Sequence, residues 1–107
     1  VPPLLISKYF TCIETRPVRR YQLVEPLRRR VHFARLNLMG EWPMRGPFDV
    51  IFCRNVMIYF DKVVQEQLAD RYWKLLKPGG HLFVGHSESL AGSLHKFRYV
   101  QPAIYVK

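Results

Sequence analysis

Glycine and cysteine are both scarce in this sequence, with six glycines and two cysteines among 107 residues. The glycines form no Gly-rich phosphate-binding loop, and neither a Gly-x-Ser-x-Gly nucleophile turn nor a pair of closely spaced carboxylates is present. Cys12 and Cys53 have neither metal-ligand spacing nor the spacing of a disulfide framework. The four histidines also lack metal-ligand spacing. Kinase, hydrolase and metalloenzyme hypotheses therefore have no support, and no metal site is expected.

Long apolar runs are absent as well. No run approaches the roughly 18 residues that a membrane-spanning helix needs, and no basic-then-apolar signal peptide opens the chain. Cys53 lies inside a short apolar run, where a buried free thiol is the expected state. These features predict a cytoplasmic protein without membrane insertion. The opening Val-Pro-Pro is no natural start, so we expect further sequence before Val1.

Acidic residues are few, with eight Asp and Glu against seventeen Lys and Arg, and the net charge is +9. Residues 1–40 carry eight of the basic and two of the acidic side chains, so most of the surplus lies there. A basic surface suits a nucleic acid or an acidic protein. No nucleic-acid-binding motif accompanies the charge, so a solvated basic face is the simpler interpretation and a nucleic-acid partner is not expected.

The apolar pattern predicts an α/β fold. Hydrophobic residues make up 49% of the chain, enough for a folded core. Residues 31–36 alternate as in a strand, whereas 48–53 and 81–85 are short, nearly continuous apolar runs typical of strands buried on both faces. Residues 61–77 have helical periodicity. We therefore expect the three strands as parallel neighbours, with the helix packed across one face.

The remaining elements are predicted to be shorter. They are, in chain order, the end of a helix at 4–10, a strand at 21–24, one turn at 27–30, a brief helix at 87–94 and a terminal pair of strands at 97–100 and 103–106. No internal repeat and no low-complexity stretch is present.

Polar residues follow each predicted strand of the sheet. Asn37 follows the first strand, Arg54 and Asn55 follow the second, and His86 follows the third. The carboxyl ends of parallel strands form the edge where open α/β sheets bind ligands. Arg54 needs either a ligand or a structural ion pair, because it directly follows a buried strand. Tyr59 is either a core aromatic or a phenol that faces the site.

Residues 47–60 closely resemble the signature of the CheR family, the S-adenosylmethionine-dependent protein-glutamate methyltransferases of bacterial chemotaxis. Their sequence is PFDVIFCRNVMIYF. Residues 75–80 resemble a motif shared by many class I methyltransferases, and residues 82–89 continue the resemblance to CheR. Upstream, the residues that fall at the family's expected places are Lys8-Tyr9-Phe10, Leu27-Arg28, Val31-His32-Phe33 and Asn37-Leu38. The resemblance thus spans nearly the whole chain.

The resemblance implies a fold and a domain organisation. In the CheR family a helical N-terminal domain precedes a class I, Rossmann-like methyltransferase domain that carries a small antiparallel β insertion. Residues 1–30 then correspond to the end of a helix plus a remnant of the inserted β-subdomain, and residues 31–107 to the C-terminal half of the methyltransferase domain. The family's Gly-rich first motif and its acidic ribose-binding residue would lie before Val1.

The resemblance also implies methyl transfer from S-adenosylmethionine (SAM) to glutamate side chains of chemotaxis receptors. The family's cofactor contacts correspond to Asn37 and Leu38 at the adenosine end, and to Arg54 and Asn55. Tyr59 matches a tyrosine near the reacting methyl group and is the candidate catalytic residue. A glutamate with a pKa of about 4.3 is already a nucleophile at neutral pH, so no general base is required.

The implied protein partner is a methyl-accepting chemotaxis receptor. Family members that dock on the receptor's C-terminal pentapeptide use glycines in the β-subdomain hairpin, and residues 11–22 contain none. Pentapeptide docking is therefore not expected. The chain on its own is expected to be inactive, and the alternative hypothesis is a non-catalytic interaction module that retains a methyltransferase fold.

Overall fold

The computed structural model describes residues 1–85, 92 and 96–107, which divide into two compact units, residues 1–35 and 36–107. The predicted brief helix at 87–94 lies outside the described residues. No helix in the described part of the chain has the length and apolarity that a membrane crossing requires.

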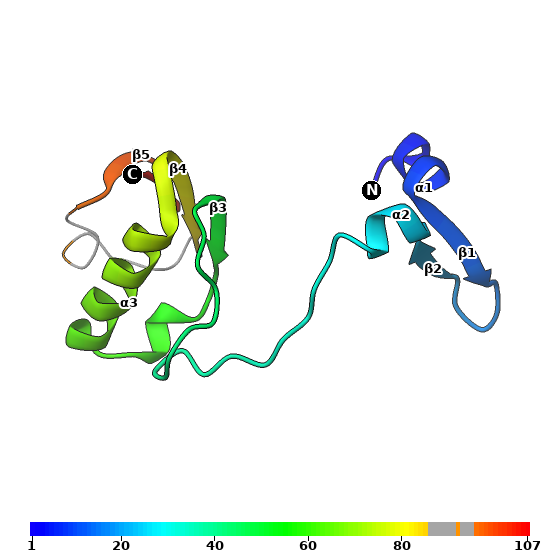
Figure 1. Ribbon diagram of the computed structural model, residues 1–107. Helices are drawn as coiled ribbons and strands as arrows, with labels where there is room; N and C mark the ends of the chain where they lie inside the picture. The colour runs from blue at the N-terminus through cyan, green and yellow to red at the C-terminus, as the bar shows by residue number, and fades with distance from the viewer. Residues whose placement is uncertain (86–91, 93–95) are drawn as a thin grey trace. The chain divides into compact units, whose positions relative to one another are not determined.

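The first unit is built around a β-hairpin. Its elements are α1 (Pro3–Tyr9), β1 (Phe10–Glu14), β2 (Arg20–Leu23) and α2 (Glu25–Arg28) (Figure 1). β1 and β2 pair antiparallel, with Phe10 opposite Leu23. A proline stands at the start of each helix, where its fixed φ suits the first turn and its missing N–H costs nothing. The small antiparallel pair of strands expected near the N-terminus is confirmed.

The second unit holds a four-stranded mixed sheet. Its elements are β3 (Phe48–Cys53), the short 3-10 helix η1 (Met57–Tyr59), α3 (Lys62–Leu75), β4 (Leu76–Val84), β5 (Arg98–Gln101) and β6 (Ile104–Val106). The strand order is β3-β4-β6-β5. β3 and β4 are parallel, and β6 is antiparallel to both of its neighbours. The predicted strand–helix–strand crossover and the terminal strand pair are both confirmed.

The predicted strand at residues 31–36 is wrong. These residues form no strand and belong to no ladder, and Phe33 is 96% exposed. Alternating apolar side chains stabilise a strand only when a neighbouring strand pairs with its backbone and one face is buried. Residues 31–36 have neither a paired strand nor a buried face, so β3 is an edge strand of the described sheet.

The predicted helix at 61–77 begins as expected but ends earlier. Asp61 is the N-cap, and its side chain accepts a hydrogen bond from the backbone N–H of Val64 at 2.9 Å. The helix stops at Leu75, since Leu76 is already extended, and Pro78 disfavours a return to helical conformation at Lys77. Gly79 then adopts a φ of 81°, and β4 continues from there.

The core lies between α3 and one face of the sheet (Figure 1). Its fully buried side chains are Met57, Leu68, Leu76, Leu82 and Val84. The opposite face carries Phe52 and Phe83, which are register partners and stack with their ring centroids 4.8 Å apart. Phe52 is 70% exposed. The sheet is therefore covered by α3 on one side and, in the described part of the chain, open on the other.

Candidate functional site

Polar residues at the carboxyl end of β3 are exposed to solvent. Cys53 ends the strand with a buried thiol, as expected, and the next two residues, Arg54 and Asn55, are both exposed. Asn55 has a φ of 57°, in the left-handed region that asparagine adopts more readily than most residues. Such backbone conformations are concentrated at functional sites. The conformation turns the chain sharply away from β3 toward η1.

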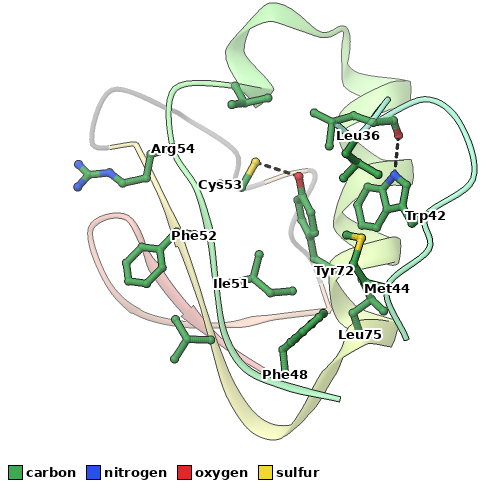
Figure 2. Close-up of a pocket in the computed structure, with 13 residues that line it drawn as sticks. Leu36, Trp42, Met44, Phe48, Ile51, Phe52, Cys53, Arg54, Tyr72 and Leu75 are labelled. Carbon is green, nitrogen blue, oxygen red and sulfur yellow. Dashed lines mark hydrogen bonds between the residues drawn. The ribbon is translucent and has the colours of Figure 1, made fainter. Parts of the chain in front are cut away.

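A cavity of about 450 Å³ lies beside this strand end, between β3, α3 and the loop of residues 36–44. Its size falls within the roughly 300–1,000 Å³ typical of small-molecule sites. The lining is mostly apolar, and Figure 2 shows the side chains that form it. Its residues are Leu36, Leu38, Trp42, Met44, Phe48, Val50, Ile51, Phe52, Cys53, Arg54, Val56, Tyr72 and Leu75. The structure thus brings Leu38 and Arg54, which are 16 positions apart in the chain, to one cavity.

Asn37 shapes the loop that carries Leu38. Its side-chain oxygen accepts a hydrogen bond from the backbone N–H of Met39 at 3.0 Å, and its carbonyl accepts one from Gly40 N–H at 3.0 Å. This is an Asx turn followed by a tight backbone turn. Asn37 is itself exposed and does not line the cavity, whereas Leu38 is half-buried and does.

Arg54 extends outward from the end of β3. In Figure 2 its guanidinium points away from Cys53 and Tyr72 and lies on the side of Phe52. It also lines a second hollow, of about 330 Å³, together with Phe52 and Phe83. Within the described residues Arg54 makes no ion pair, so the structural ion-pair alternative gains no support there.

Tyr59 lies in η1 and is 80% exposed. The core position in this segment is taken instead by Met57, which is fully buried. The core-aromatic alternative for Tyr59 is therefore wrong for this structure. Its phenol is accessible, although it does not line the cavity of about 450 Å³. His86, the remaining candidate, lies outside the described residues.

The wall between the cavity and the core contains an interaction that the sequence did not indicate. The Cys53 thiol and the Tyr72 hydroxyl lie 2.9 Å apart, and either atom can donate the hydrogen bond (Figure 2). Tyr72 lies in the predicted helix at 61–77, whose periodicity gives no sign of this contact. The contact joins Cys53, the residue before Arg54 and the last of β3, to the last turn of α3.

Trp42 and Arg71 were also missed. Trp42 Nε1 donates to the Leu38 carbonyl at 3.1 Å, and Arg71 Nη1 donates to the same carbonyl at 3.1 Å. The sequence does contain one indication for Arg71. It is three positions after Leu68 and four before Leu75, so a charged residue borders the apolar stripe of α3.

Two groups with shifted pKa values, Asp49 and Tyr105, do not line the cavity. Asp49, at the beginning of β3, has its pKa lowered by a hydrogen bond from Lys77 and by that residue's charge. Burial, and to a lesser extent Tyr99, raise the pKa of Tyr105. Among the described residues no three His, Cys, Asp or Glu side chains converge as metal ligands would.

The chain is similar to known chemotaxis methyltransferases over almost its whole length. Residues 1–106 match the family model described as "CheR methyltransferase, SAM binding domain". The "Chemotaxis protein methyltransferase" of Borreliella burgdorferi is 40% identical over 108 residues, covering 100% of this chain and 37% of that protein. The "Probable chemotaxis protein methyltransferase" of Rhizobium etli is 44% identical over 92 residues, covering 86% of this chain and 34% of that protein. The chain therefore spans about a third of the length of these relatives.

Proposed function

The chain belongs to the CheR methyltransferase family, whose matched domain binds SAM, and from this premise we propose that it supplies one wall of a SAM site. In a full-length polypeptide, this wall would serve methyl transfer to glutamate side chains of chemotaxis receptors. The proposal goes beyond the family assignment in naming the acceptor, the partner and the residues that act.

The observation that carries the proposal is the shared cavity of Leu38 and Arg54 at the carboxyl end of β3. SAM combines a flat adenine with a ribose, a sulfonium and an amino-acid end. The apolar side chain of Leu38 suits the adenine, and the exposed N–H groups of Arg54 suit the acceptor atoms of the cofactor. Asn37 and Asn55 stand beside these two residues in the chain and add side-chain amides. The residues present thus fit the cofactor that the family binds.

Tyr59 is the proposed catalytic residue. When bound, SAM supplies a methyl group on a positively charged sulfur, which makes the methyl electrophilic. The exposed phenol of Tyr59 would meet the acceptor glutamate or the reacting methyl and orient them. Because a glutamate with a pKa of about 4.3 is ionised at neutral pH, the site needs to align and shield rather than to remove a proton. Alignment of this kind can supply roughly 7–11 kcal/mol of the barrier.

The proposed partner is the cytoplasmic part of a methyl-accepting receptor, and the proposed location is the cytoplasm. In the first unit both acidic side chains are already paired, Glu14 with Arg20 and Glu25 with Arg29. The remaining basic side chains of this unit are a net surplus that suits an acidic protein surface. Docking on a receptor pentapeptide is not part of the proposal, since the hairpin lacks glycine between residues 11 and 22.

The test is a transfer assay with a full-length polypeptide that includes this chain. The enzyme is incubated with methyl-labelled SAM and a receptor cytoplasmic fragment, and label is located by peptide mass spectrometry. We expect base-labile methyl esters on glutamates and a loss of rate in Tyr59→Phe. A receptor fragment with glutamine at the labelled positions is the control and should take up no label. Binding of the receptor without any transfer would favour the non-catalytic interaction module instead.

A further inference from the structure

The loop that carries Asn37 and Leu38 has no regular secondary structure to hold it in place. The two hydrogen bonds that Asn37 accepts fix the local shape of the loop, but they reach only two or three residues along the chain. Behind the loop lies a hollow of about 380 Å³, lined by Glu41, Trp42, Met44, Arg71, Lys74 and Leu75. Leu38 and Trp42 pack against the core, and on the side of the hollow the position of the loop depends on specific contacts.

Those contacts come from one side chain of α3. Arg71 Nη1 donates to the carbonyl of Leu38 at 3.1 Å and also to the carbonyl of Gly40. These partners are 33 and 31 residues away in the chain. A single guanidinium thus bridges two carbonyls of the turn, and hydrogen bonds from a charged donor are about twice as strong as neutral ones.

We call the bridge from Arg71 to the carbonyls of Leu38 and Gly40 the clamp, and Trp42 strengthens it. The Arg71 guanidinium lies over the Trp42 ring at 5.0 Å from its centroid, and Trp42 Nε1 donates to the Leu38 carbonyl. Trp42 in turn packs against Tyr72, with centroids 5.4 Å apart, and the hydroxyl of Tyr72 meets the thiol of Cys53. A continuous series of contacts therefore joins the Leu38 turn to the end of β3, the two places that hold the proposed cofactor contacts.

We infer that Arg71 is a positioning residue of the SAM site: it clamps the Leu38 carbonyl and so sets how Leu38 and Asn37 are presented to the adenosine end of the cofactor. This inference rests on the proposed function. Arg71 itself does not line the cavity that Leu38 and Arg54 share. Its effect is exerted on the backbone of the residue that does, so it should change affinity for the cofactor more than the rate of transfer from bound cofactor.

The experiment compares Arg71→Met, Arg71→Lys and the control Lys74→Met in a full-length polypeptide that includes this chain. Lys74 is exposed, lies on the same helix and carries the same charge. Calorimetry with SAM gives Kd, and transfer at saturating SAM gives kcat. We expect Kd to rise about tenfold in Arg71→Met, equivalent to about 1.4 kcal/mol, with kcat nearly unchanged. Lysine restores the charge but not the planar guanidinium that lies over the Trp42 ring, so Arg71→Lys should fall between.

A spectroscopic signal reports on the clamp itself. With 5-fluorotryptophan incorporated, the fluorine resonance of Trp42 is assigned by its loss in Trp42→Phe. It should move in Arg71→Met and stay in place in Lys74→Met. Wild-type Kd in Arg71→Met, or in Arg71→Lys if the methionine variant does not fold, would overturn the inference. A wild-type protein that binds no SAM would instead overturn the proposed function, so the two failures are distinguishable.

Discussion

Replacing Arg54 by methionine tests whether its guanidinium contacts the cofactor or stabilises the fold. Methionine keeps much of the length and apolar stem of arginine, so the substitution removes chiefly the guanidinium. Arg54 is exposed and makes no ion pair within the described residues. Exposed substitutions of this kind usually change the free energy of unfolding by no more than about 0.5 kcal/mol. A hydrogen bond from a charged group to a buried ligand is worth about 1.5–3 kcal/mol, which is about 10–150-fold in Kd.

The assay for this prediction uses a full-length polypeptide that includes the chain. Calorimetric titration with SAM gives Kd, and thermal unfolding without cofactor gives Tm. The matched control is Arg98→Met, because Arg98 is also exposed and lies on β5. We expect weaker SAM binding with an almost unchanged Tm for Arg54→Met, and neither effect for Arg98→Met. A Tm lowered by many degrees together with wild-type Kd in the folded fraction would refute the reasoning and make Arg54 a structural residue.

Three further predictions concern the scaffold of the second unit. Asp61→Ala removes the hydrogen bond to Val64 N–H and should cost about 1 kcal/mol, or about 4–8 °C in Tm for a domain of 60–100 residues, as read by thermal unfolding. Gly46→Ala should lower Tm more, because Gly46 has a φ of +61° and a Cβ there would lie 2.5 Å from the Leu75 carbonyl oxygen. Finally, the raised pKa of Tyr105 means that the folded state retains the phenolic proton more tightly than the unfolded state does. Stability from this group is complete below about pH 10 and is lost as the pH rises further, which Tm measurements from pH 8 to 11 would show.

Each of these predictions has a variant that isolates its cause. Asp61→Asn keeps a capping oxygen and should stay close to wild type, so an equal loss in both variants would contradict the capping argument. Gly79→Ala imposes the same left-handed strain at a φ of +81° but has no atom within 4 Å of the new Cβ. If it destabilises as much as Gly46→Ala, the close approach to Leu75 contributes nothing. Tyr105→Phe should remove part of the alkaline decline.

The elements that the sequence predicted well are those with local determinants. The β3 run and the amphipathic pattern of α3 can be read without knowing their neighbours, and the cap at Asp61 is a single-residue signal. Residues 31–36 show what such local patterns cannot predict. Their alternation is as clear as that of a strand, yet a strand also needs a paired neighbour, and that requirement is not local.

Only part of the candidate site could be predicted from the sequence. Arg54 and Asn55 could be placed at a strand end because β3 was recognised, and Leu38 was reached through the family resemblance. The positive φ of Asn55 has no sequence signature beyond the tolerance of asparagine for it. The clamp of Arg71 on the Leu38 turn escaped prediction because it joins residues more than 30 positions apart, and no periodicity or spacing encodes such a contact.

Three of the candidate site residues contribute little to the core of this unit. Arg54, Asn55 and Tyr59 are exposed, so the free energy of folding depends little on them. The core beneath is apolar and close to fully buried, and it fixes the end of β3 without using those side chains. The Leu38 turn differs, because hydrogen bonds from Arg71 and Trp42 hold it in addition to the packing of Leu38 and Trp42 against the core. Loss of the Arg71 charge should therefore affect the Leu38 turn more than the end of β3.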